Sequence, residues 1–502
     1  MERRRVLWFG RVPSGADAEQ VKDHGFELVE CADGRDPDCQ YACAAIFWAT
    51  GRDFRKAAVC LKRYVGKALN EGVYVVVVVS GEADDIRLKE VTKILEGNDP
   101  HRVLTQQYRI RSEPVSVHQL MNALLRHDAG PAKNSKLEIQ PPHGLPPESQ
   151  LLIQRAFHDC CRVRLTPIAR GFSGADTYIV EAMLRASFAG QEVQPFFAKL
   201  GDSSKLKEEM ARFAQFAEYY VPWYLRPNFL REKCLFGVSK AILVGSFVRD
   251  SVSLSECVQS GAGPQHIHSL FEETLGGLRQ QSRSADEGTA TSVVDALAGF
   301  SNHDRVPSKR YRRAAELFGG QRIEPETLWW QMLSLPPLSW RKSAIHGDMH
   351  GENVRVRKQD AIVIDFAQAC IGPASADLAN LEVWLAFECL GSGPLREEWR
   401  ALIGELYSSE LIGLSLEDRR RISGQHWLLP CIAEIRSLAR GAIESLDEYK
   451  RVLAVYLLRQ ASFPANREFL EEDEYRRSFA YWLSCKLVES LCSEEHLPLG
   501  TS

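Results

Sequence analysis

The first 128 residues alternate short apolar runs with longer stretches of mixed apolar and polar residues. Runs of β-branched and aromatic residues predict strands, and the mixed stretches predict helices. The strands are expected at 5–9, 26–30, 44–49, 73–80 and, weakly, 102–104, and the helices at 16–24, 54–69, 84–95 and 115–127. Because strands that alternate with helices form βαβ units, this pattern predicts an α/β domain whose parallel sheet has a flavodoxin-like strand order.

A segment rich in proline follows this domain. Residues 130–149 contain five prolines and show no helical or strand periodicity. Such a composition is typical of an interdomain linker, partly extended by its prolines. The expected organisation is therefore a domain at 1–129, a linker at 130–149 and a second domain at 150–502.

The second domain is expected to be α+β, with strands first and helices later. Strands are expected at 162–168, 177–183, 194–200 and 241–247, and a hairpin at 354–356 and 361–364. Helices are expected at 151–161, 205–219, 266–281, 293–299, 309–318, 326–335, 377–389, 396–406, 416–423, 427–440, 446–460 and 475–491. The hairpin is thus flanked by helices on both sides.

Three side chains at one end of this hairpin suit phosphoryl transfer. Asp348 lies in the loop that enters the first strand, Asn353 opens that strand, and Asp365 ends the second. A carboxylate in such a loop can accept or orient the proton of a hydroxyl nucleophile. The amide and the second carboxylate offer the oxygen ligands that Mg²⁺ prefers.

The motifs around these residues resemble those of a known group of enzymes. The sequence H-G-D-x-H-x-x-N at 346–353, with I-D-F at 364–366, resembles the aminoglycoside phosphotransferase and choline kinase group, which has a protein-kinase-like fold. The spacing from the loop aspartate to the asparagine is that of the protein-kinase catalytic loop. The segment G-P-x-x-x-D-L-A at 372–379 resembles the one that follows in this group.

The resemblance implies a two-lobed fold and a site that uses ATP and Mg²⁺. Asp348 would be the catalytic base, and Asn353 and Asp365 the metal ligands. His346 and Asp377 would brace the catalytic loop. The implied reaction is transfer of a phosphoryl group to a small molecule.

Two positions depart from the pattern of the group. Gly351 stands where many relatives have proline, and we expect this glycine to loosen the loop. Ala367 follows Asp365 and Phe366 where protein kinases have glycine. The second departure argues against a protein-kinase type of switch at that turn.

Upstream residues are candidates to hold the nucleotide. A turn that contains Gly171, Ser173 and Gly174 lies between two predicted strands. It is expected to place backbone N–H groups over the ATP phosphates, although a plain hairpin turn is the alternative. Lys199, in the next strand, is expected to hold the phosphates. The alternative for Lys199 is an edge-strand lysine whose ammonium group extends to water.

The helix after this strand offers two glutamates as partners for the lysine. Glu209 is preferred because it lies three residues after Leu206 and so borders the apolar face of the helix. Glu208 is the alternative. Backbone groups within 244–247 are expected to bind adenine as a hinge, and a buried edge strand would have the same sequence pattern.

The N-terminal domain resembles a response-regulator receiver in outline. In receivers carboxylates follow the first strand, and a phospho-acceptor aspartate ends the third. Here Gly10-Arg11 and Thr50-Gly51 stand at these positions, and only Ser80 matches a receiver hydroxyl. We interpret the domain as a degenerate receiver-like module used for contacts with a protein partner. An unrelated flavodoxin-like domain is the alternative.

Composition restricts partners and location. The 502 residues are 45% hydrophobic and 25% charged, with a formal net charge of −4, so the basic excess typical of nucleic-acid or membrane-surface binding is lacking. We expect no nucleic-acid partner and no membrane association, since no apolar run has the length of a span. The 13 cysteines include no C-x-x-C pair, which indicates reduced thiols in a cytoplasmic protein.

Two groups of charged residues bear on the acceptor. Helices of the C-terminal subdomain form the acceptor wall in this enzyme group, so Glu382, Glu388 and Glu434 are candidates to face a cationic acceptor. The alternative is that they are ordinary exposed glutamates. The basic run at 309–313 is interpreted as a solvated helix face, with a site for an anionic substrate or partner as the alternative.

Together these patterns predict an ATP-dependent phosphotransferase that moves the γ-phosphoryl group to a hydroxyl of a small-molecule acceptor. The first alternative is a catalytically silent, nucleotide-binding signalling or scaffold module. A second alternative is adenylylation, which would place the nucleotide the other way round.

Overall fold

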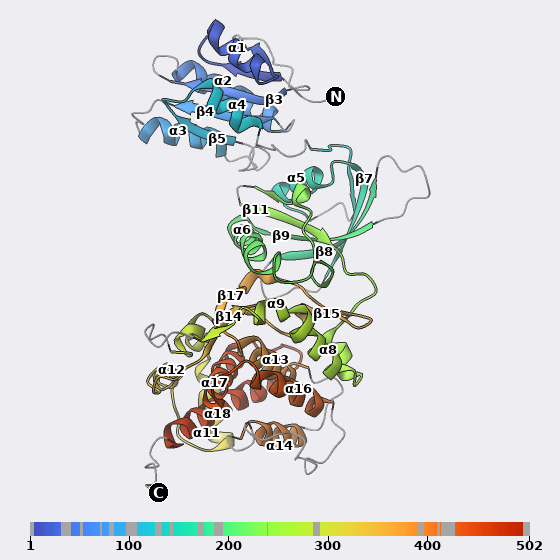
Figure 1. Ribbon diagram of the computed structural model, residues 1–502, viewed down its shortest axis with the longest axis vertical. Helices are drawn as coiled ribbons and strands as arrows, with labels where there is room; N and C mark the ends of the chain where they lie inside the picture. Colours follow the sequence, from blue (N-terminus) through green and yellow to red (C-terminus); the bar gives the residue numbers. More distant parts are fainter. Residues whose placement is uncertain are drawn as a thin grey trace. The chain divides into compact units, whose positions relative to one another are not determined.

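The computed structural model describes residues 5–31, 42–50, 54–70, 73–79, 85–96, 108–125, 133–140, 144–168, 175–184, 194–237, 239–284, 292–389, 396–408, 412 and 427–494. The chain divides into two compact units (Figure 1). The first comprises Met1–Glu208 and Asn228–Phe247, and the second comprises Glu209–Pro227 and Val248–Ser502.

The N-terminal part of the first unit is a parallel five-stranded sheet flanked by helices. The spatial order is β2 (Glu27–Glu30), β1 (Arg5–Phe9), β3 (Ala42–Ala49), β4 (Tyr74–Val79) and β5 (Tyr108–Ser112). The helices are α1 (Gly15–Asp23), α2 (Phe54–Asn70), α3 (Asp85–Glu96) and α4 (Val117–Leu125). The order 2-1-3-4-5 is the flavodoxin-like order that the alternation of elements predicted.

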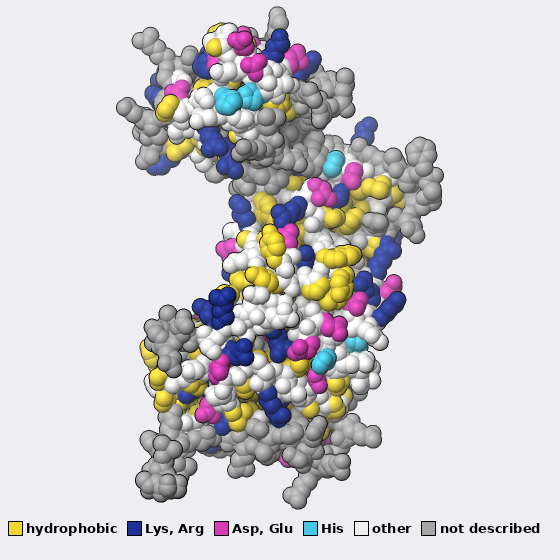
Figure 2. All heavy atoms as spheres, viewed as in Figure 1, with side chains coloured by type: hydrophobic (Ala, Val, Ile, Leu, Met, Phe, Trp, Pro, Cys, Tyr) yellow, Lys and Arg dark blue, Asp and Glu magenta, His cyan; other side chains and the backbone are white. Residues whose placement is uncertain are grey.

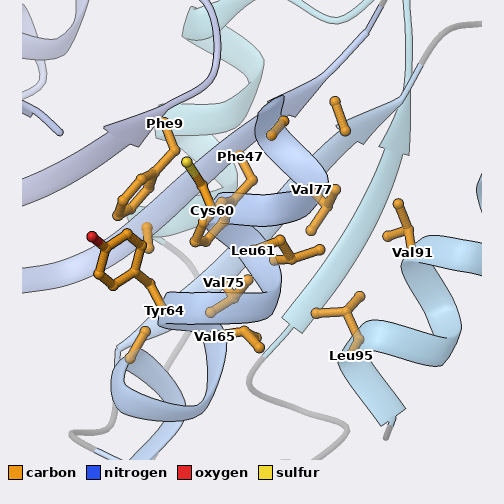
Figure 3. Close-up of a cluster of buried hydrophobic side chains, with 14 of the residues drawn as sticks. Phe9, Phe47, Cys60, Leu61, Tyr64, Val65, Val75, Val77, Val91 and Leu95 are labelled. Carbon is orange, nitrogen blue, oxygen red and sulfur yellow. The ribbon is translucent and has the colours of Figure 1, made fainter. Parts of the chain in front are cut away.

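Alternating residues of the strands build two cores, one on each face of the sheet. In β3, Ala45 and Phe47 face the core that α2 and α3 cover, with Leu61 and Val91 (Figure 3). Trp48, from the same strand, belongs to the opposite core with the residues of α1 and α4. Strands buried on both faces explain the continuous apolar runs, because successive side chains point to opposite sides.

The last strand of this sheet differs from the prediction. The expected strand at 102–104 lies outside the described residues, and the observed β5 begins at Tyr108. Tyr108 and Ile110 pack against the α2–α3 core, while Arg109 and Arg111 do not. This alternation is typical of a half-buried edge strand.

The rest of the first unit is a six-stranded sheet with one covering helix. The spatial order is β10 (Leu235–Phe236), β11 (Lys240–Ser246), β9 (Gln194–Asp202), β8 (Asp176–Leu184), β7 (Cys160–Pro167) and β6 (Glu138–Gln140). Helix α5 (Pro147–Ala156) packs on the sheet through Leu152, Ile153 and Ala156. The pairs are antiparallel except β6 with β7.

The segment expected to be a linker contributes to this sheet. Strand β6 pairs in parallel with β7, and the Asn134 side chain donates to the Cys160 carbonyl oxygen at 2.7 Å. Leu137 is buried in the core of the sheet. A linker over all of 130–149 is therefore wrong for residues 134–140 and for the start of α5, which the proline pattern did not reveal.

Two small antiparallel sheets lie in the second unit. One contains β12 (Val252–Ser253), β15 (Val354–Arg357) and β16 (Asp360–Val363), and the other contains β13 (Arg283–Ser284), β14 (Arg341–Ile345) and β17 (Cys370–Pro373). The hairpin of β15 and β16 is the one predicted, with Lys358 at φ 56° in its turn. Strands β14 and β17 were not predicted.

Helices make up most of the second unit. They are α6 (Ser203–Arg212, shared with the first unit), α7 (Leu254–Gln259), α8 (Gly263–Ser269), α9 (Gly276–Arg279), α10 (Ala298–Ser301), α11 (Ser308–Phe318), α12 (Pro325–Leu333), α13 (Ala376–Phe387), α14 (Arg396–Leu406), α16 (Leu428–Arg440), α17 (Leu446–Ser462) and α18 (Leu470–Glu494). A π-helical turn at Phe213–Ala217 continues α6. The helix expected at 416–423 lies outside the described residues.

Helix α17 is the buried centre of this helical part. Nearly all of its side chains are buried, and it packs against α13 and α18. Its buried residues include the apolar run 452–458 and also charged residues such as Glu448 and Arg451. On the visible face, acidic and basic side chains are interspersed, as the small net charge predicts (Figure 2). In the described part of the chain, no helix combines the length and apolarity needed to cross a membrane.

Candidate active site

The candidate catalytic loop connects β14 to the hairpin. His346, Gly347 and Asp348 follow β14 directly, and a 3₁₀ turn at Gly351–Asn353 leads into β15. Asn353 is thus the last residue of this turn and does not open the strand, which begins at Val354. The loop is held between two sheets because β14 pairs with β17 and β15 pairs with β16.

The His346 ring connects the loop to the end of the hairpin. Its Nδ1 accepts from the Asp348 backbone N–H at 3.3 Å, so its Nε2 carries the proton and donates to the Ile364 carbonyl oxygen at 3.0 Å. The side chain is fully buried. His346 therefore fixes the backbone of Asp348 relative to the residue that precedes Asp365.

Asp377, near the start of α13, binds two backbone N–H groups of the same loop. Its two carboxylate oxygens accept the backbone N–H groups of His346 at 2.7 Å and Gly347 at 2.9 Å. Burial raises the pKa of the Asp377 carboxyl above its ordinary value, although His346 and the two backbone hydrogen bonds oppose the rise. Asp377 thus contacts the loop from α13, and His346 is part of the loop that both residues were predicted to brace.

Two glycines allow the close packing of this loop. Gly347 has φ +80°, and a Cβ at this position would overlap the Gln368 carbonyl oxygen. A Cβ at Gly351 would overlap the Trp384 ring and the Ser255 hydroxyl. Gly351 therefore gives Trp384 room to pack against the loop, and the expectation that this glycine loosens the loop is replaced by a packing role.

The Asp348 carboxylate lies between two basic side chains. Its Oδ1 accepts from Arg459 Nη2 at 2.8 Å, and its Oδ2 lies 3.7 Å from His350 Nε2. Burial lowers the pKa of His350, although the neighbouring Asp348 carboxylate opposes this. His350 is therefore mostly neutral at physiological pH, and Arg459 is the charged partner of Asp348.

Asp365 lies two residues beyond β16 in a tight turn. Its backbone has φ 62°, in the left-handed region that non-glycine residues rarely adopt, and its Oδ1 accepts from the Ala367 N–H at 3.3 Å. Phe366 is buried between His346 and Phe213, with ring centroids 5.0 Å and 5.8 Å away. Strained residues of this kind cluster at functional sites.

The side-chain amide nitrogen of Asn353 already has a hydrogen-bond partner. The Nδ2 group donates to the Asp348 carbonyl oxygen at 2.9 Å, and the Asn353 carbonyl oxygen accepts from the Ile364 N–H at 2.9 Å. The amide oxygen is the end that the Nδ2 contact leaves for other ligands. An amide oxygen with one carboxylate suits Mg²⁺, which takes few protein ligands and completes its shell with phosphate oxygens and water.

The candidate metal site has a sparse set of donor atoms. Within the described ranges, no group of three or more His, Cys, Asp or Glu side chains could hold a metal ion. A two-ligand magnesium site of Asn353 and Asp365 would not contain such a group. An amide oxygen and one carboxylate fit Mg²⁺ that is bound together with a nucleotide.

The candidate phosphate-binding residues lie in both units. Lys199 is on the central strand β9 with a 5% exposed side chain, paired in register with Thr177 and Leu243. The edge-strand alternative for Lys199 is therefore wrong, because β9 has a neighbour on each side. In α6, Glu209 of the second unit is 6% exposed, whereas the preceding Glu208 is exposed, as the apolar periodicity predicted.

Two further candidates for the nucleotide site are placed only in part. Gly171, Ser173 and Gly174 lie outside the described residues. The predicted hinge at 244–247 covers the end of β11, where Val244 is buried and Ser246 is exposed.

The glutamates expected to face a cationic acceptor are all paired. Glu382 is fully buried and accepts from Arg436 at 2.7 Å and from the Tyr449 hydroxyl at 2.7 Å. Glu388 is bonded by Arg477 and Gln460, and Glu434 by His268 at 2.8 Å. Glu382 is therefore a structural residue, and the other two are not unpaired carboxylates.

The basic run at 309–313 is not a solvated face throughout. Arg310 is 2% exposed and forms a bidentate pair with Glu474, both contacts at 2.9 Å. Lys309 also contacts Glu474, and Arg313 contacts Glu471 at 3.0 Å. Most of this positive charge is therefore used to dock α11 onto α18.

Two residues of the site were missed by sequence reasoning. Arg459 is an arginine within the apolar helix α17, and it meets Asp348 only through tertiary packing. A charged residue in an otherwise apolar run was the available signal. Arg212 donates to the Ala367 carbonyl oxygen and so anchors the turn after Asp365. Its position at the end of α6 gave no such signal.

One family model and several solved structures resemble this chain. Residues 165–413 match the profile described as the phosphotransferase enzyme family. No curated protein sequence matches the chain at a significant level.

Several solved structures resemble the chain at low identity. Choline kinase from Cryptosporidium parvum is 12% identical with a TM-score of 0.33, over 67% of this chain and 92% of that one. A glucosamine kinase is 11% identical with a TM-score of 0.31, over 66% and 94%. A putative fructosamine-3-kinase from Haemophilus somnus is 13% identical with a TM-score of 0.32, over 65% and 92%. These likenesses are too distant to transfer a substrate, but the family match is direct. Residues 165–413 of this chain are therefore similar to the phosphotransferase enzyme family.

Proposed function

We propose that this protein transfers the γ-phosphoryl group of ATP to a hydroxyl of a small molecule. The main support is a hydrogen-bond network that connects the backbone and side chains around Asp348, Asn353 and Asp365. The Ile364 backbone accepts from His346 and donates to the Asn353 carbonyl oxygen, and Asn353 in turn donates to the Asp348 carbonyl oxygen. Asp365 directly follows Ile364, so the network holds base and metal ligands in one preorganised group.

In this proposal Asp348 orients the acceptor and receives its proton. Arg459 and His350 flank the carboxylate, and Oδ2 is the oxygen that the close contact with Arg459 leaves for the hydroxyl. The acceptor oxygen forms a bond to the γ-phosphorus, the bond from this phosphorus to the β–γ bridging oxygen breaks, and ADP leaves. Positioning and charge stabilisation are the main contributions of a protein to such a transfer.

The remaining candidates would hold the nucleotide. Asn353 and Asp365 would hold Mg²⁺, which when bound neutralises charge on the phosphates. Lys199 and Glu209 would form the phosphate-binding pair, and the turn with Gly171, Ser173 and Gly174 would cover the phosphates. The buried positions of Lys199 and Glu209 support this assignment, because a buried charge is retained only where a partner stabilises it.

The test separates binding from chemistry with two aspartate variants. Asp365→Ala should weaken Mg²⁺-ATP binding and abolish turnover together. Asp348→Ala should keep nucleotide binding and lose turnover by about 10²–10⁴-fold, the usual contribution of a general base. Calorimetry measures the binding, and ADP release with an identified acceptor measures the turnover. Asp360→Ala is the matched control, since this hairpin aspartate pairs only with the half-exposed Arg357 among the described contacts.

The same measurements address the alternatives. Nucleotide binding without turnover over a broad acceptor panel would favour the silent module. Release of pyrophosphate in place of ADP would indicate adenylylation. Full turnover in Asp348→Ala would contradict the assignment of the catalytic loop.

For the N-terminal domain we propose a degenerate receiver-like module that contacts a protein partner. The strand order supports the comparison in outline. The position after β1, where receivers have carboxylates, is occupied by Arg11, whose guanidinium lies 4.1 Å from the centre of the Trp48 ring and pairs with Asp17 at 2.8 Å. A cation stacked on tryptophan at this edge disfavours Mg²⁺ and supports the loss of phosphorylation chemistry.

A further inference from the structure

The contact between Arg459 and Asp348 changes the charge that an acceptor meets. Arg459 lies in the last turn of α17 and donates to Asp348 Oδ1 at 2.8 Å and weakly to the Gly347 carbonyl oxygen at 3.5 Å. Its side chain is 12% exposed. A guanidinium has five N–H donors, and these two contacts leave part of this donor set for a ligand at the Asp348 carboxylate.

Aromatic rings hold this guanidinium in place. Its central carbon lies 5.7 Å from the ring centres of Phe300 and Phe463, and 5.9 Å from that of Tyr456. Its Nε is buried without a hydrogen-bond partner among the described residues. Because the side chain is packed on these rings, its charge stays beside Asp348 and does not move to water.

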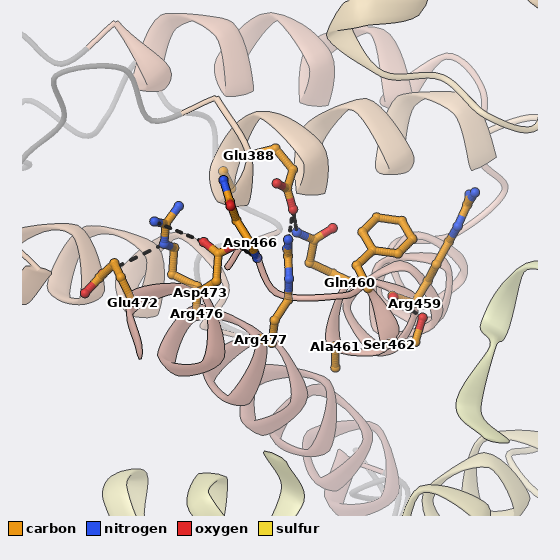
Figure 4. Close-up of polar contacts among 12 residues, drawn as sticks. Glu388, Arg459, Gln460, Ala461, Ser462, Asn466, Glu472, Asp473, Arg476 and Arg477 are labelled. Atoms are coloured by element: carbon orange, nitrogen blue, oxygen red, sulfur yellow. Dashed lines mark hydrogen bonds and ion pairs between the residues drawn. The ribbon is translucent and has the colours of Figure 1, made fainter. Parts of the chain in front are cut away.

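The neighbouring carboxylate is also neutralised. Glu388 faces the Gln460 amide, next to Arg459 in sequence, and is bonded by Arg477, as Figure 4 shows. Arg477 is 5% exposed, so this pair is largely shielded from water. In Figure 4 the Arg459 side chain extends away from Gln460 and Arg477, so it does not share their carboxylate. Each of the two carboxylates at this end of α17 has its own arginine.

We propose that Arg459 determines acceptor specificity by charge. The inference rests on the proposed function, in which Asp348 orients the acceptor hydroxyl. The acceptor carries an anionic group, a carboxylate or a phosphate, close to this hydroxyl. The anionic group binds the remaining N–H groups of Arg459, as guanidinium groups bind carboxylate and phosphate oxygens. An ammonium group at the same position meets the like charge of Arg459.

A matched series of three-carbon acceptors tests this proposal. Glycerate and glycerol 3-phosphate are anionic, glycerol is neutral, and 2-amino-1,3-propanediol is cationic. With wild type, ADP release should give a kcat/KM that falls from the anionic to the neutral to the cationic compound, by about tenfold or more between the extremes. The two anionic compounds distinguish a carboxylate from a phosphate as the recognised group.

Three variants separate charge selection from a purely positioning role. Arg459→Gln should remove the preference, mainly by raising the KM of the anionic compounds, whereas Arg459→Lys should keep the order. Arg312→Gln removes the same charge from an exposed position of α11 and should change nothing. A fall by one common factor for all compounds in Arg459→Gln, or a wild-type preference for the cationic compound, would overturn the proposal.

A binding measurement distinguishes this proposal from the proposed function. If none of the compounds is phosphorylated, calorimetric titration with glycerate and with 2-amino-1,3-propanediol still reports on charge selection. Tighter binding of glycerate to wild type, lost in Arg459→Gln and kept in Arg312→Gln, would support the role of Arg459 although the phosphotransferase proposal had failed. Equal binding to wild type and Arg459→Gln would overturn it.

Discussion

Removal of the Asp377 carboxylate should release the catalytic loop. In Asp377→Ala two buried backbone N–H groups, those of His346 and Gly347, lose the acceptors that now lie at 2.7 Å and 2.9 Å. Each buried unsatisfied donor costs about 1–3 kcal/mol. Because the carboxylate is itself costly to bury, as its raised pKa shows, we expect the lower part of the sum, a loss of about 2–4 kcal/mol in the free energy of unfolding.

The loss in the free energy of unfolding should depend on the two acceptor oxygens of Asp377 and not on the volume of its side chain. Asp377→Asn fills the same space and keeps one acceptor oxygen, so about half of the loss is expected. Asp304→Ala removes an exposed carboxylate of the same unit and should change the unfolding free energy by less than about 0.5 kcal/mol.

Denaturant unfolding measures the overall loss, and amide hydrogen exchange localises it. The peptide that contains His346 and Gly347 should exchange faster in Asp377→Ala, while peptides from the N-terminal sheet should not change. Local opening of the loop should also reduce turnover. Unchanged exchange of the loop amides, together with an unfolding free energy within 0.5 kcal/mol of wild type, would refute the bracing role.

Three further outcomes follow from single features. Gly347→Ala should destabilise the protein by at least about 1 kcal/mol, because φ is +80° and the added Cβ overlaps the Gln368 carbonyl oxygen; thermal unfolding measures it, and an unchanged melting temperature would contradict it. Burial raises the pKa of Glu448 in the folded protein to about 7. As the pH rises from about 4.5 to 7, the Glu448 carboxyl ionises in the unfolded chain before it ionises in the folded protein, so the free energy of unfolding should fall by up to about 3 kcal/mol. This fall should be absent in Glu448→Gln. The full chain incubated with Mg²⁺ and acetyl phosphate should gain no phosphate in its N-terminal domain, since Arg11 occupies the edge where an acidic site would lie; a labile aspartyl phosphate there in mass spectra would contradict this.

The sequence was sufficient where a feature depends on local pattern. The hairpin at β15 and β16 follows from two apolar runs around a polar turn, and the choice of Glu209 over Glu208 follows from helical periodicity. The candidate site was found because its residues lie within one short stretch around the hairpin. Such features are set by neighbours in the sequence.

Features that depend on tertiary packing were missed. Strands β14 and β17 are short, and in the described part of the chain they pair with each other and with β13. Their sequences show no strong alternation of apolar and polar residues. The Arg459 contact joins residues 111 positions apart. Strand β5 was not predicted at Tyr108–Ser112, where Arg109 and Arg111 alternate with Tyr108 and Ile110.

One helix end connects two parts of the proposed chemistry. Glu209, Arg212 and Phe213 lie within five residues, at the end of α6 and the start of the π-helical turn. Arg212 holds the Ala367 carbonyl oxygen and Phe213 packs on Phe366, so the turn that carries Asp365 is fixed to the helix that carries Glu209. Because residues on one rigid helix move together, a displacement of Glu209 must also displace the metal-ligand turn or break these contacts. In the proposed function, the positions of Glu209 and of the turn that carries Asp365 are thereby coupled through the contacts of Arg212 and Phe213.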